Sequence, residues 1–296
     1  MDTFCFGFQA MGSGCEVVLV STSNTEAQSI AALAIEEVSR IERKYSRYRS
    51  ESIVSRINAV AGVEGVKCDD ETLALFKYAD ILYSSSGGLF DITAGVLRRA
   101  WDFRSGVVPD EETLAPILAL IGWKRVERHG KEVRLPLAGM EFDFGGFGKE
   151  YAADRAASIM HGKGVRHGYV NLAGDIRVIG PKPDGSPWMI GIQDPRNRER
   201  TIASLPLFTG ALATSGDYER YFEVDGRRYC HIIHPRSGYP VAHWRSVTVI
   251  APLAVTAGSH TTIAMLKEAD GLGFLQESGF GYFAVDRLGQ IYHKDV

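Results

Sequence analysis

The most constraining feature of this sequence is the irregular order in which helical and strand patterns follow one another. Strand patterns dominate the second half of the chain, at 169–179, 188–193, 202–213, 218–233 and 246–251. Asp225-Gly226 predicts a hairpin turn inside the fourth of them. The chain shows no repeat of strand–helix–strand units of roughly 30 residues, which would indicate a parallel sheet. We therefore expect an α+β, or mixed, fold with largely antiparallel sheets and helices.

Apolar residues also recur at helical spacing, and capping residues delimit several of the helices. The expected helices begin at Thr25, Asp70, Pro109-Asp110 and Lys149, and a last one follows Ala251 and runs to about Ala269. Thr25 and Gln28 have the spacing of a capping box, and Gly87-Gly88 ends the helix that begins at Asp70. The remaining strands are expected at 4–20, at 140–144 and, as a terminal pair, at 282–292.

Length and composition limit the organisation and the partners. The 296 residues suffice for a large core and contain no low-complexity linker, so we expect one domain, 1–296, of two intimate lobes. A net charge of -3 without a basic cluster argues against nucleic acid or an anionic membrane surface as the main partner. No stretch approaches the roughly 18 apolar residues of a membrane helix, so no membrane span is expected.

The cysteines and the N-terminus predict a cytoplasmic protein. The four cysteines form no C-x-x-C pair, which favours free thiols in a reducing compartment. The first residues carry neither a basic segment nor a long apolar run, so no leader is expected in this chain, although one could have been removed from it.

Four segments place glycines beside polar residues at strand ends, where the main chain can approach a ligand closely. They are 87–93, 143–149, 171–175 and 214–218, the last followed by 231–238. In the second segment, Gly145, Gly146 and Gly148 precede a helix and Lys149 adds a positive charge, which suits a phosphate. The spacing matches neither the dinucleotide-binding motif nor the P-loop, and a tight strand-to-helix turn is an equally valid interpretation.

Purely structural roles stay open for the polar residues of the other segments. Asp91 fits the N-cap of a helix that begins near Thr93, while Ser215 and Asp217 fit a turn. His231, in a strand pattern, fits a half-buried structural histidine. The sequence has no H-E-x-x-H, no G-x-S-x-G and no cysteine and histidine set with zinc-ligand spacing. These absences argue against zinc enzymes and nucleophile-elbow hydrolases.

Taken together and in this order, the motifs resemble those of the ApbE family, the FAD:protein FMN transferases. The resembling segments are Met11-Gly12-Ser13, 45–48 with Ser52 and Asn58, 90–93 with Trp101, 143–146 with Lys149, 151–154, 214–218, 231–238 and 246–249. They extend over most of the chain. The resemblance implies an α+β fold in which FAD lies in a cleft between two lobes.

The resemblance also assigns residues to that cleft. The implied cofactor-binding residues are Met11 and Tyr48 at the flavin, Leu89, Phe90 and Asp91 at the nucleotide, Asp143 and Lys149 at the ribose or phosphates, and Ser215 and Ile233. His231 is the candidate general base, because its ring titrates near neutrality, and Asp217 is the next candidate. Magnesium would be held by the main-chain carbonyl near Gly146 and by the hydroxyl of Thr262.

The sequence departs from the family at the metal. Gly258 stands where the family has an aspartate, four residues before Thr262, and Glu150 stands where it has a glycine. Because Mg²⁺ sites normally include a carboxylate, we expect weak or lost Mg²⁺ binding and a gain in affinity from Gly258→Asp. His234 also replaces a family aspartate, which makes the cleft less negative, with Glu150 a partial offset if it points inward.

Three functions follow from these residues. The first is transfer of FMN from FAD to a threonine or serine hydroxyl of a target flavoprotein, with release of AMP. The second is FAD binding without transferase activity, because Gly258 supplies no carboxylate. The third is hydrolysis of FAD to FMN and AMP, in which water replaces the acceptor hydroxyl. The hydrolase depends most on a metal ion and is therefore disfavoured most by Gly258.

Overall fold

The largest element of the structure, a computed structural model that describes residues 1–295, is one antiparallel sheet of eight strands. Its order is β1-β2-β6-β7-β10-β13-β14-β15, and all neighbours are antiparallel. The strands are β1 (Asp2–Ala10), β2 (Ser13–Ser21), β6 (Gly168–Leu172), β7 (Asp175–Gly180), β10 (Gly210–Gly216), β13 (Trp244–Ala251), β14 (Gly281–Asp286) and β15 (Ile291–Lys294). The expected α+β fold with antiparallel sheets is confirmed; Val296 of the expected domain lies outside the described residues.

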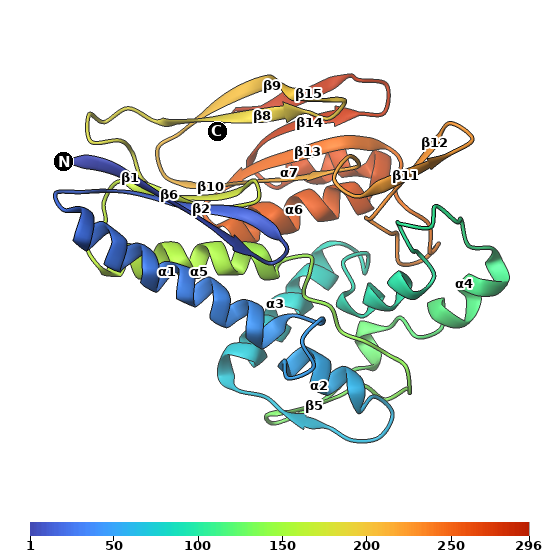
Figure 1. Cartoon of the computed structure of the whole chain (residues 1–296). Helices are drawn as coiled ribbons and strands as arrows, with labels where there is room; N and C mark the ends of the chain where they lie inside the picture. Colours follow the sequence, from blue (N-terminus) through green and yellow to red (C-terminus); the bar gives the residue numbers. More distant parts are fainter. Residues whose placement is uncertain (296) are drawn as a thin grey trace.

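Three helices cover one face of this sheet (Figure 1). They are α1 (Asn24–Tyr45), α5 (Gly148–Gly162) and α6 (Ala254–Leu266), and α5 contacts both of the others. Small side chains allow the close approach of α5, since Ala152, Ala153, Ala156 and Ala157 are all buried. The packing of α5 against α6 positions the site, because both helices carry residues expected in the cleft. Among residues 1–295, no helix is long and apolar enough to cross a membrane.

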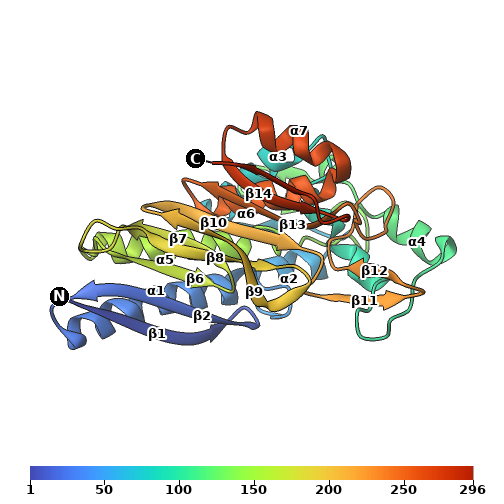
Figure 2. The same ribbon diagram turned by 90° about the horizontal axis from the view of Figure 1, so that it is seen from above.

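A hairpin of β8 (Trp188–Asp194) and β9 (Asn197–Leu207) packs on the sheet away from these helices (Figure 2). Its Trp188 and Leu207 join a small cluster with Val178 of β7 and Leu212 of β10. The neighbours of Leu212 in the strand, Ala211 and Ala213, belong instead to the main core under the helices. The centre of the sheet is therefore buried on both faces, as expected for strands with nearly continuous apolar sequence.

The second lobe lies below the main sheet in Figure 1. It contains α2 (Ile53–Ala59), α3 (Asp70–Ser85) and a small sheet of β3 (Val66–Lys67), β5 (Glu132–Arg134) and β4 (Glu127–His129). The Phe76 ring lies 5.0 Å from that of Phe142 and 5.4 Å from that of Phe144, and such tilted ring pairs add to the stabilisation from burial. These rings belong to the main core cluster, so one core joins the two lobes.

The remaining elements connect the lobes or border the cleft. They are η1 (Ile92–Arg99), α4 (Glu111–Leu118), η2 (Trp123–Arg125), β11 (Tyr221–Val224), β12 (Arg227–Cys230), η3 (Glu268–Asp270) and α7 (Gly271–Glu277). The hairpin predicted at Asp225-Gly226 is confirmed as the turn between β11 and β12, and the terminal pair is confirmed as β14 and β15. The small sheet β3-β5-β4 and helix α7 have no counterpart in the sequence prediction.

The strand expected at 140–144 is wrong, because this segment is an irregular loop. Its burial does alternate as in a strand, since Met140, Phe142 and Phe144 are buried. Instead of a neighbouring strand, the side chain of Asn58 binds the main chain of Phe142, at 2.7 Å from its nitrogen and 3.0 Å from its oxygen. A side-chain amide thus satisfies the main-chain groups that a strand partner would otherwise bind.

Three element boundaries also differ from the prediction. The pattern at 169–179 divides into β6 and β7 at Ala173-Gly174, where both residues have positive φ. The pattern at 202–213 divides between β9 and β10. The first helix begins at Asn24, and its N-cap is Ser23 rather than Thr25. Each difference lies at a turn or a helix cap. The periodicity of apolar residues locates the ends of helices and strands less well than their interiors.

An ionic cluster centred on Glu71 ties α1, α3 and α5 together. Its carboxylate accepts hydrogen bonds from Arg40 at 2.7 and 2.9 Å and from the Tyr151 hydroxyl at 2.8 Å, and Lys44 is also paired with it. The Arg40 hydrogen bonds, followed by Lys44 and Tyr151, hold the pKa of Glu71 well below its usual value of 4.5. The stabilisation is therefore complete above about pH 4.5 and is lost as the pH falls further.

We expect Glu71→Gln to lower the free energy of unfolding by about 2 kcal/mol at pH 7, because hydrogen bonds to charged groups are lost. The difference from the wild type should shrink as the pH falls below 4.5, where the wild-type carboxylate loses its advantage. Urea unfolding at several pH values measures both effects. Glu36→Gln is the matched control, since Glu36 pairs with Arg43 on the surface and should change stability little.

Candidate active site

Met11, which is expected at the flavin, lies with Gly12 in the turn of the hairpin between β1 and β2. The backbone is left-handed at both turn residues, with φ of 52° at Met11 and 75° at Gly12. Asparagine or glycine normally occupies the first position of such a turn, because the Cβ atom of methionine is crowded at positive φ. Strained residues of this kind cluster at functional sites. The contact of Met11 with the flavin stays a prediction.

Tyr48 and Asp143 come together through Arg47. The Arg47 guanidinium forms an ion pair with Asp143, donates to the Tyr48 hydroxyl at 2.8 Å and lies 4.9 Å from the centre of the Tyr48 ring. Asp143 also accepts from the amide of Gly145 at 2.9 Å. Because Tyr48 is 76% exposed, its ring is open to a ligand. Arg47 was not among the residues expected in the cleft, although its position beside Tyr48 in the sequence indicated it.

The segment at 89–91 is partly structural. Asp91 caps η1, since its carboxylate accepts from the amide of Thr93 at 2.8 Å and from that of Trp123 at 3.0 Å. The ring of Phe90 is buried against Gly146, where a Cβ atom would lie only 2.8 Å from it. The nucleotide contacts of Phe90 and Asp91 stay predictions, and the Phe90 ring as placed is turned into the core.

Lys149 and Asp175 form an ion pair in which the carboxylate is buried and the lysine side chain is partly exposed. Their charged atoms are 2.6 Å apart, and the side chain of Asp175 is only 4% exposed. Burial by itself lowers the pKa of Lys149, but the charges of Asp175 and Glu150 and the hydrogen bond to Asp175 together outweigh this effect, and the pKa is raised overall. Lys149 therefore carries its positive charge at neutral pH. Asp175 stands at the end of the glycine-containing segment 171–175, which the sequence analysis identified without assigning this residue.

The hydroxyl groups of Ser215 and Thr262 meet between β10 and α6. Their oxygens are 3.4 Å apart, and the hydroxyl of Thr261 lies 2.8 Å from that of Ser215. Thr261 also hydrogen-bonds the carbonyl oxygen of Gly258 at 2.8 Å. The predicted cofactor residue Ser215 and the predicted metal ligand Thr262 are thus neighbours in space.

Helices α5 and α6 contact each other through Glu150 and Gly258. Glu150 is 7% exposed, and within residues 1–295 its Oε2 atom has no hydrogen-bond partner. A Cβ atom at position 258 would lie 2.5 Å from Glu150 Oε1 and 2.6 Å from its Cγ. Burial, followed by the charge of Asp175, raises the pKa of Glu150. The gain expected from Gly258→Asp alone does not fit this packing, because Glu150 occupies the space that a side chain would need.

His231 directly follows β12, and the residue is exposed although neighbouring protein atoms crowd its ring, so the interpretation as a half-buried histidine stays open. The surrounding protein atoms, and then the charges of Arg220 and Lys149, lower its pKa, which keeps the ring neutral and able to accept a proton at pH 7. The second candidate base, Asp217, forms ion pairs with Arg196 at 2.6 Å and Arg228 at 3.4 Å. Arg196 donates to both carboxylate oxygens of Asp217, so neither oxygen is free of a partner.

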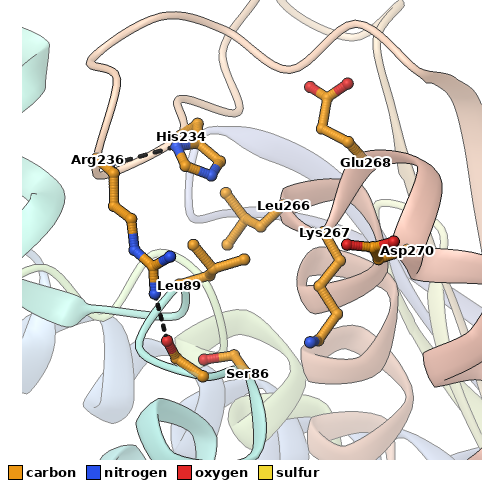
Figure 3. A pocket seen from close by; sticks show the side chains of 9 residues that line it. Ser86, Leu89, His234, Arg236, Leu266, Lys267, Glu268 and Asp270 are labelled. Carbon is orange, nitrogen blue, oxygen red and sulfur yellow. Dashed lines mark hydrogen bonds between the residues drawn. The ribbon is translucent and has the colours of Figure 1, made fainter.

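A pocket of about 420 Å³ opens beside Leu89 (Figure 3). Its lining consists of Ser86, Gly87, Leu89, His234, Arg236, Leu266, Lys267, Glu268 and Asp270. The Arg236 side chain lies along one side of the pocket and donates a hydrogen bond to the carbonyl oxygen of Gly87 at 2.6 Å. Ile233, the residue before His234, pairs its main chain with Pro240 at the base of the same loop. Leucine side chains in this lining offer contacts for an apolar ring, and the cations Arg236 and Lys267 stand beside two carboxylates, Glu268 and Asp270.

This chain is similar to known proteins in both sequence and structure. The model of the ApbE family matches residues 11–283. The ApbE protein of Thermotoga maritima is 34% identical, with a TM-score of 0.91, over 99% of this chain and 97% of that chain. The flavinyl transferase ApbE of Pseudomonas stutzeri is 30% identical, with a TM-score of 0.87, over 99% of this chain and 95% of that one. An FAD:protein FMN transferase of Vibrio cholerae is 32% identical over 240 residues, 78% of this chain and 72% of the relative.

These matches span both lobes and include every glycine-containing segment of the cleft. The matched residues run from the strained hairpin turn at Met11 to β14, through the Lys149–Asp175 pair and the helix that carries Thr262. The sequence motifs, the fold and the family model therefore agree, and the chain belongs to the ApbE family.

Proposed function

We propose that this chain transfers FMN from FAD to a threonine or serine hydroxyl of a target flavoprotein. The acceptor oxygen attacks the phosphorus of the FMN half of FAD, the bond from that phosphorus to the bridging oxygen breaks, and AMP leaves with this oxygen. The hydroxyl proton passes to a base on the enzyme. Relatives named FAD:protein FMN transferase favour this reaction over FAD binding alone and over FAD hydrolysis.

The observation that carries the proposal is the ApbE fold, in which Lys149 pairs with Asp175 and the hydroxyls of Ser215 and Thr262 lie 3.4 Å apart. Lys149 remains protonated, because the charges of Asp175 and Glu150 raise its pKa, and the pKa of His231 is lowered, which keeps its ring neutral. A fixed cation suits the pyrophosphate, and a neutral imidazole suits the acceptor proton. In this proposal the exposed ring of Tyr48 contacts the flavin, and the nucleotide lies toward Leu89 and Ile233.

Magnesium is part of this proposal, and the residues present fit it. Mg²⁺ prefers oxygen donors, and the Ser215 and Thr262 hydroxyls lie 3.4 Å apart. At the contact between α5 and α6, a buried carboxylate oxygen of Glu150 has no hydrogen-bond partner among residues 1–295. In the described part of the chain, no three histidine, cysteine, aspartate or glutamate side chains form a metal-binding group, so phosphate oxygens and water would complete the coordination. When bound, the ion neutralises pyrophosphate charge. The carbonyl near Gly146 stays a predicted ligand.

The proposed location is cytoplasmic, with the acceptor flavoprotein as partner. All four cysteines are free thiols; Cys5 is exposed and the other three are buried. Free thiols are the usual state in a reducing compartment, which supports this location.

Incubation of the protein with FAD, MgCl₂ and a candidate flavoprotein domain tests the function. We expect the acceptor to show flavin fluorescence in a denaturing gel and AMP to appear in equal amount. The matched control is the same domain with its acceptor hydroxyl residue replaced by alanine, which should stay unlabelled. AMP release without labelling would indicate hydrolysis instead, and FAD binding without AMP release would indicate a binding protein.

A further inference from the structure

Glu150 is an unusual residue for the interior of this protein. It lies in the first turn of α5, 7% exposed, and within the described residues its Oε2 atom has no hydrogen-bond partner. A buried carboxylate without partners is costly, because it loses hydration and gains nothing in return. An alanine or a leucine would satisfy helix packing at this position without that cost. The position of Glu150 is therefore better explained by a ligand than by the fold.

The space around Glu150 exists because position 258 has no side chain. A Cβ atom on Gly258 would lie 2.5 Å from Oε1, 2.6 Å from Cγ and 2.8 Å from Cδ of Glu150. The overlap includes Cγ as well as the carboxylate, so rotation of the terminal group alone would not remove it. The two positions are complementary, since only one of them can carry a carboxylate in this space.

Position 258 lies next to oxygen donors that suit a hard cation. Thr262 is one helical turn further along α6 and therefore on the same face as Gly258. Its hydroxyl lies 3.4 Å from that of Ser215, and Thr261 bonds both Ser215 and the Gly258 carbonyl. Glu150 thus brings a carboxylate from α5 to the face of α6 on which these hydroxyls lie.

We infer that Glu150 is the carboxylate ligand of a divalent cation of the Mg²⁺ class, delivered from α5 in place of a side chain at position 258. This inference rests on the proposed function for the identity of the cation. It replaces the expectation, drawn from Gly258 alone, that Mg²⁺ binding is weak or lost. The carboxylate has moved from one helix to the helix packed against it, while Thr262 keeps its place.

The alternative ligand for Glu150 is the Lys149 ammonium group. That group pairs with Asp175 at 2.6 Å, and within the described residues it forms no ion pair with Glu150. His260 is not a competing ligand in this arrangement, because its ring stacks on Phe274, 5.2 Å between centres, and its Nδ1 lies 2.8 Å from the Thr256 carbonyl oxygen.

Titration with Mn²⁺, followed by the loss of its electron paramagnetic resonance signal, and with Mg²⁺ in a calorimeter tests the inference in the presence of FAD. We expect Glu150→Gln to weaken metal binding at least 10–100-fold, because it removes the only charged side-chain ligand. The matched control is Glu37→Gln, which removes a buried glutamate of α1 that pairs with Arg40 of the same helix and with Arg155 of α5. This control should bind the metal as the wild type does.

The exchange Glu150→Gly with Gly258→Asp is the decisive variant. It returns the carboxylate to α6 and should restore metal affinity to within a few-fold of the wild type, whereas Gly258→Asp alone should be destabilised by overlap. Circular dichroism melting shows whether each variant folds. If Glu150→Gln does not fold, the metal affinity of the double variant tests the inference instead. Unchanged metal affinity in Glu150→Gln, or no metal binding by the wild type, would overturn the inference. Metal binding without FMN transfer would instead contradict the proposed function alone.

Discussion

The His231→Ala variant should lose turnover by about 10²–10⁴-fold while it keeps its affinity for FAD, the range expected for a positioned general base. The lowered pKa of His231 leaves the imidazole neutral at pH 7, ready to take the acceptor proton. Because the shift is downward, the acidic limb of the pH profile should fall below the ordinary value of 6.5. Single-turnover AMP release and FAD calorimetry separate the catalytic effect from the binding effect.

Asp217→Asn provides the comparison for this prediction. Its carboxylate is held by Arg196 and Arg228, so we expect its loss to affect stability more than the chemical step. A fully active His231→Ala protein would show that another group takes the proton. An equal loss of FAD affinity and turnover would make His231 a binding residue.

The second large effect is expected for Asp154→Ala, which should lower the free energy of unfolding by about 3 kcal/mol. Asp154 lies in α5, and its two carboxylate oxygens accept from the amides of Ala254 and Val255, both at 2.9 Å. Arg177 pairs with the same carboxylate at 3.2 Å. The substitution leaves two amides at the start of α6 and one guanidinium without their partner. Urea unfolding measures the loss.

Asp154 also controls the site, because α6 carries Gly258 and Thr262. The residue at the N-cap of α6 is Leu253, which makes no side-chain cap hydrogen bond, so Asp154 is the cap for this helix. We expect Asp154→Asn to keep one amide hydrogen bond and to lose less stability than Asp154→Ala. Equal stability of the alanine variant and the wild type would show that water caps α6 as well as the carboxylate does.

The sequence was sufficient for the family and for the main elements of the fold. Each family motif consists of residues adjacent in sequence, a glycine beside a polar residue. Such a motif can be recognised without knowledge of its tertiary contacts. The same holds for the helices, whose apolar spacing is set by one turn of backbone, and for the hairpin at Asp225-Gly226. The strand expected at 140–144 failed because periodicity reports burial and not the hydrogen-bond partner, which here is Asn58.

Only the tertiary structure decided how the cleft residues are connected. The cap that Asp154 places on α6 joins residues 100 positions apart in sequence, and nothing in either segment indicates it. From the sequence alone, Gly258 is a lost carboxylate and Glu150 an unrelated substitution; the packing of α5 on α6 puts both in one space. Helix and strand patterns are determined by residues close together in the sequence. The replacement of a carboxylate at position 258 by Glu150 depends instead on which faces of α5 and α6 pack together.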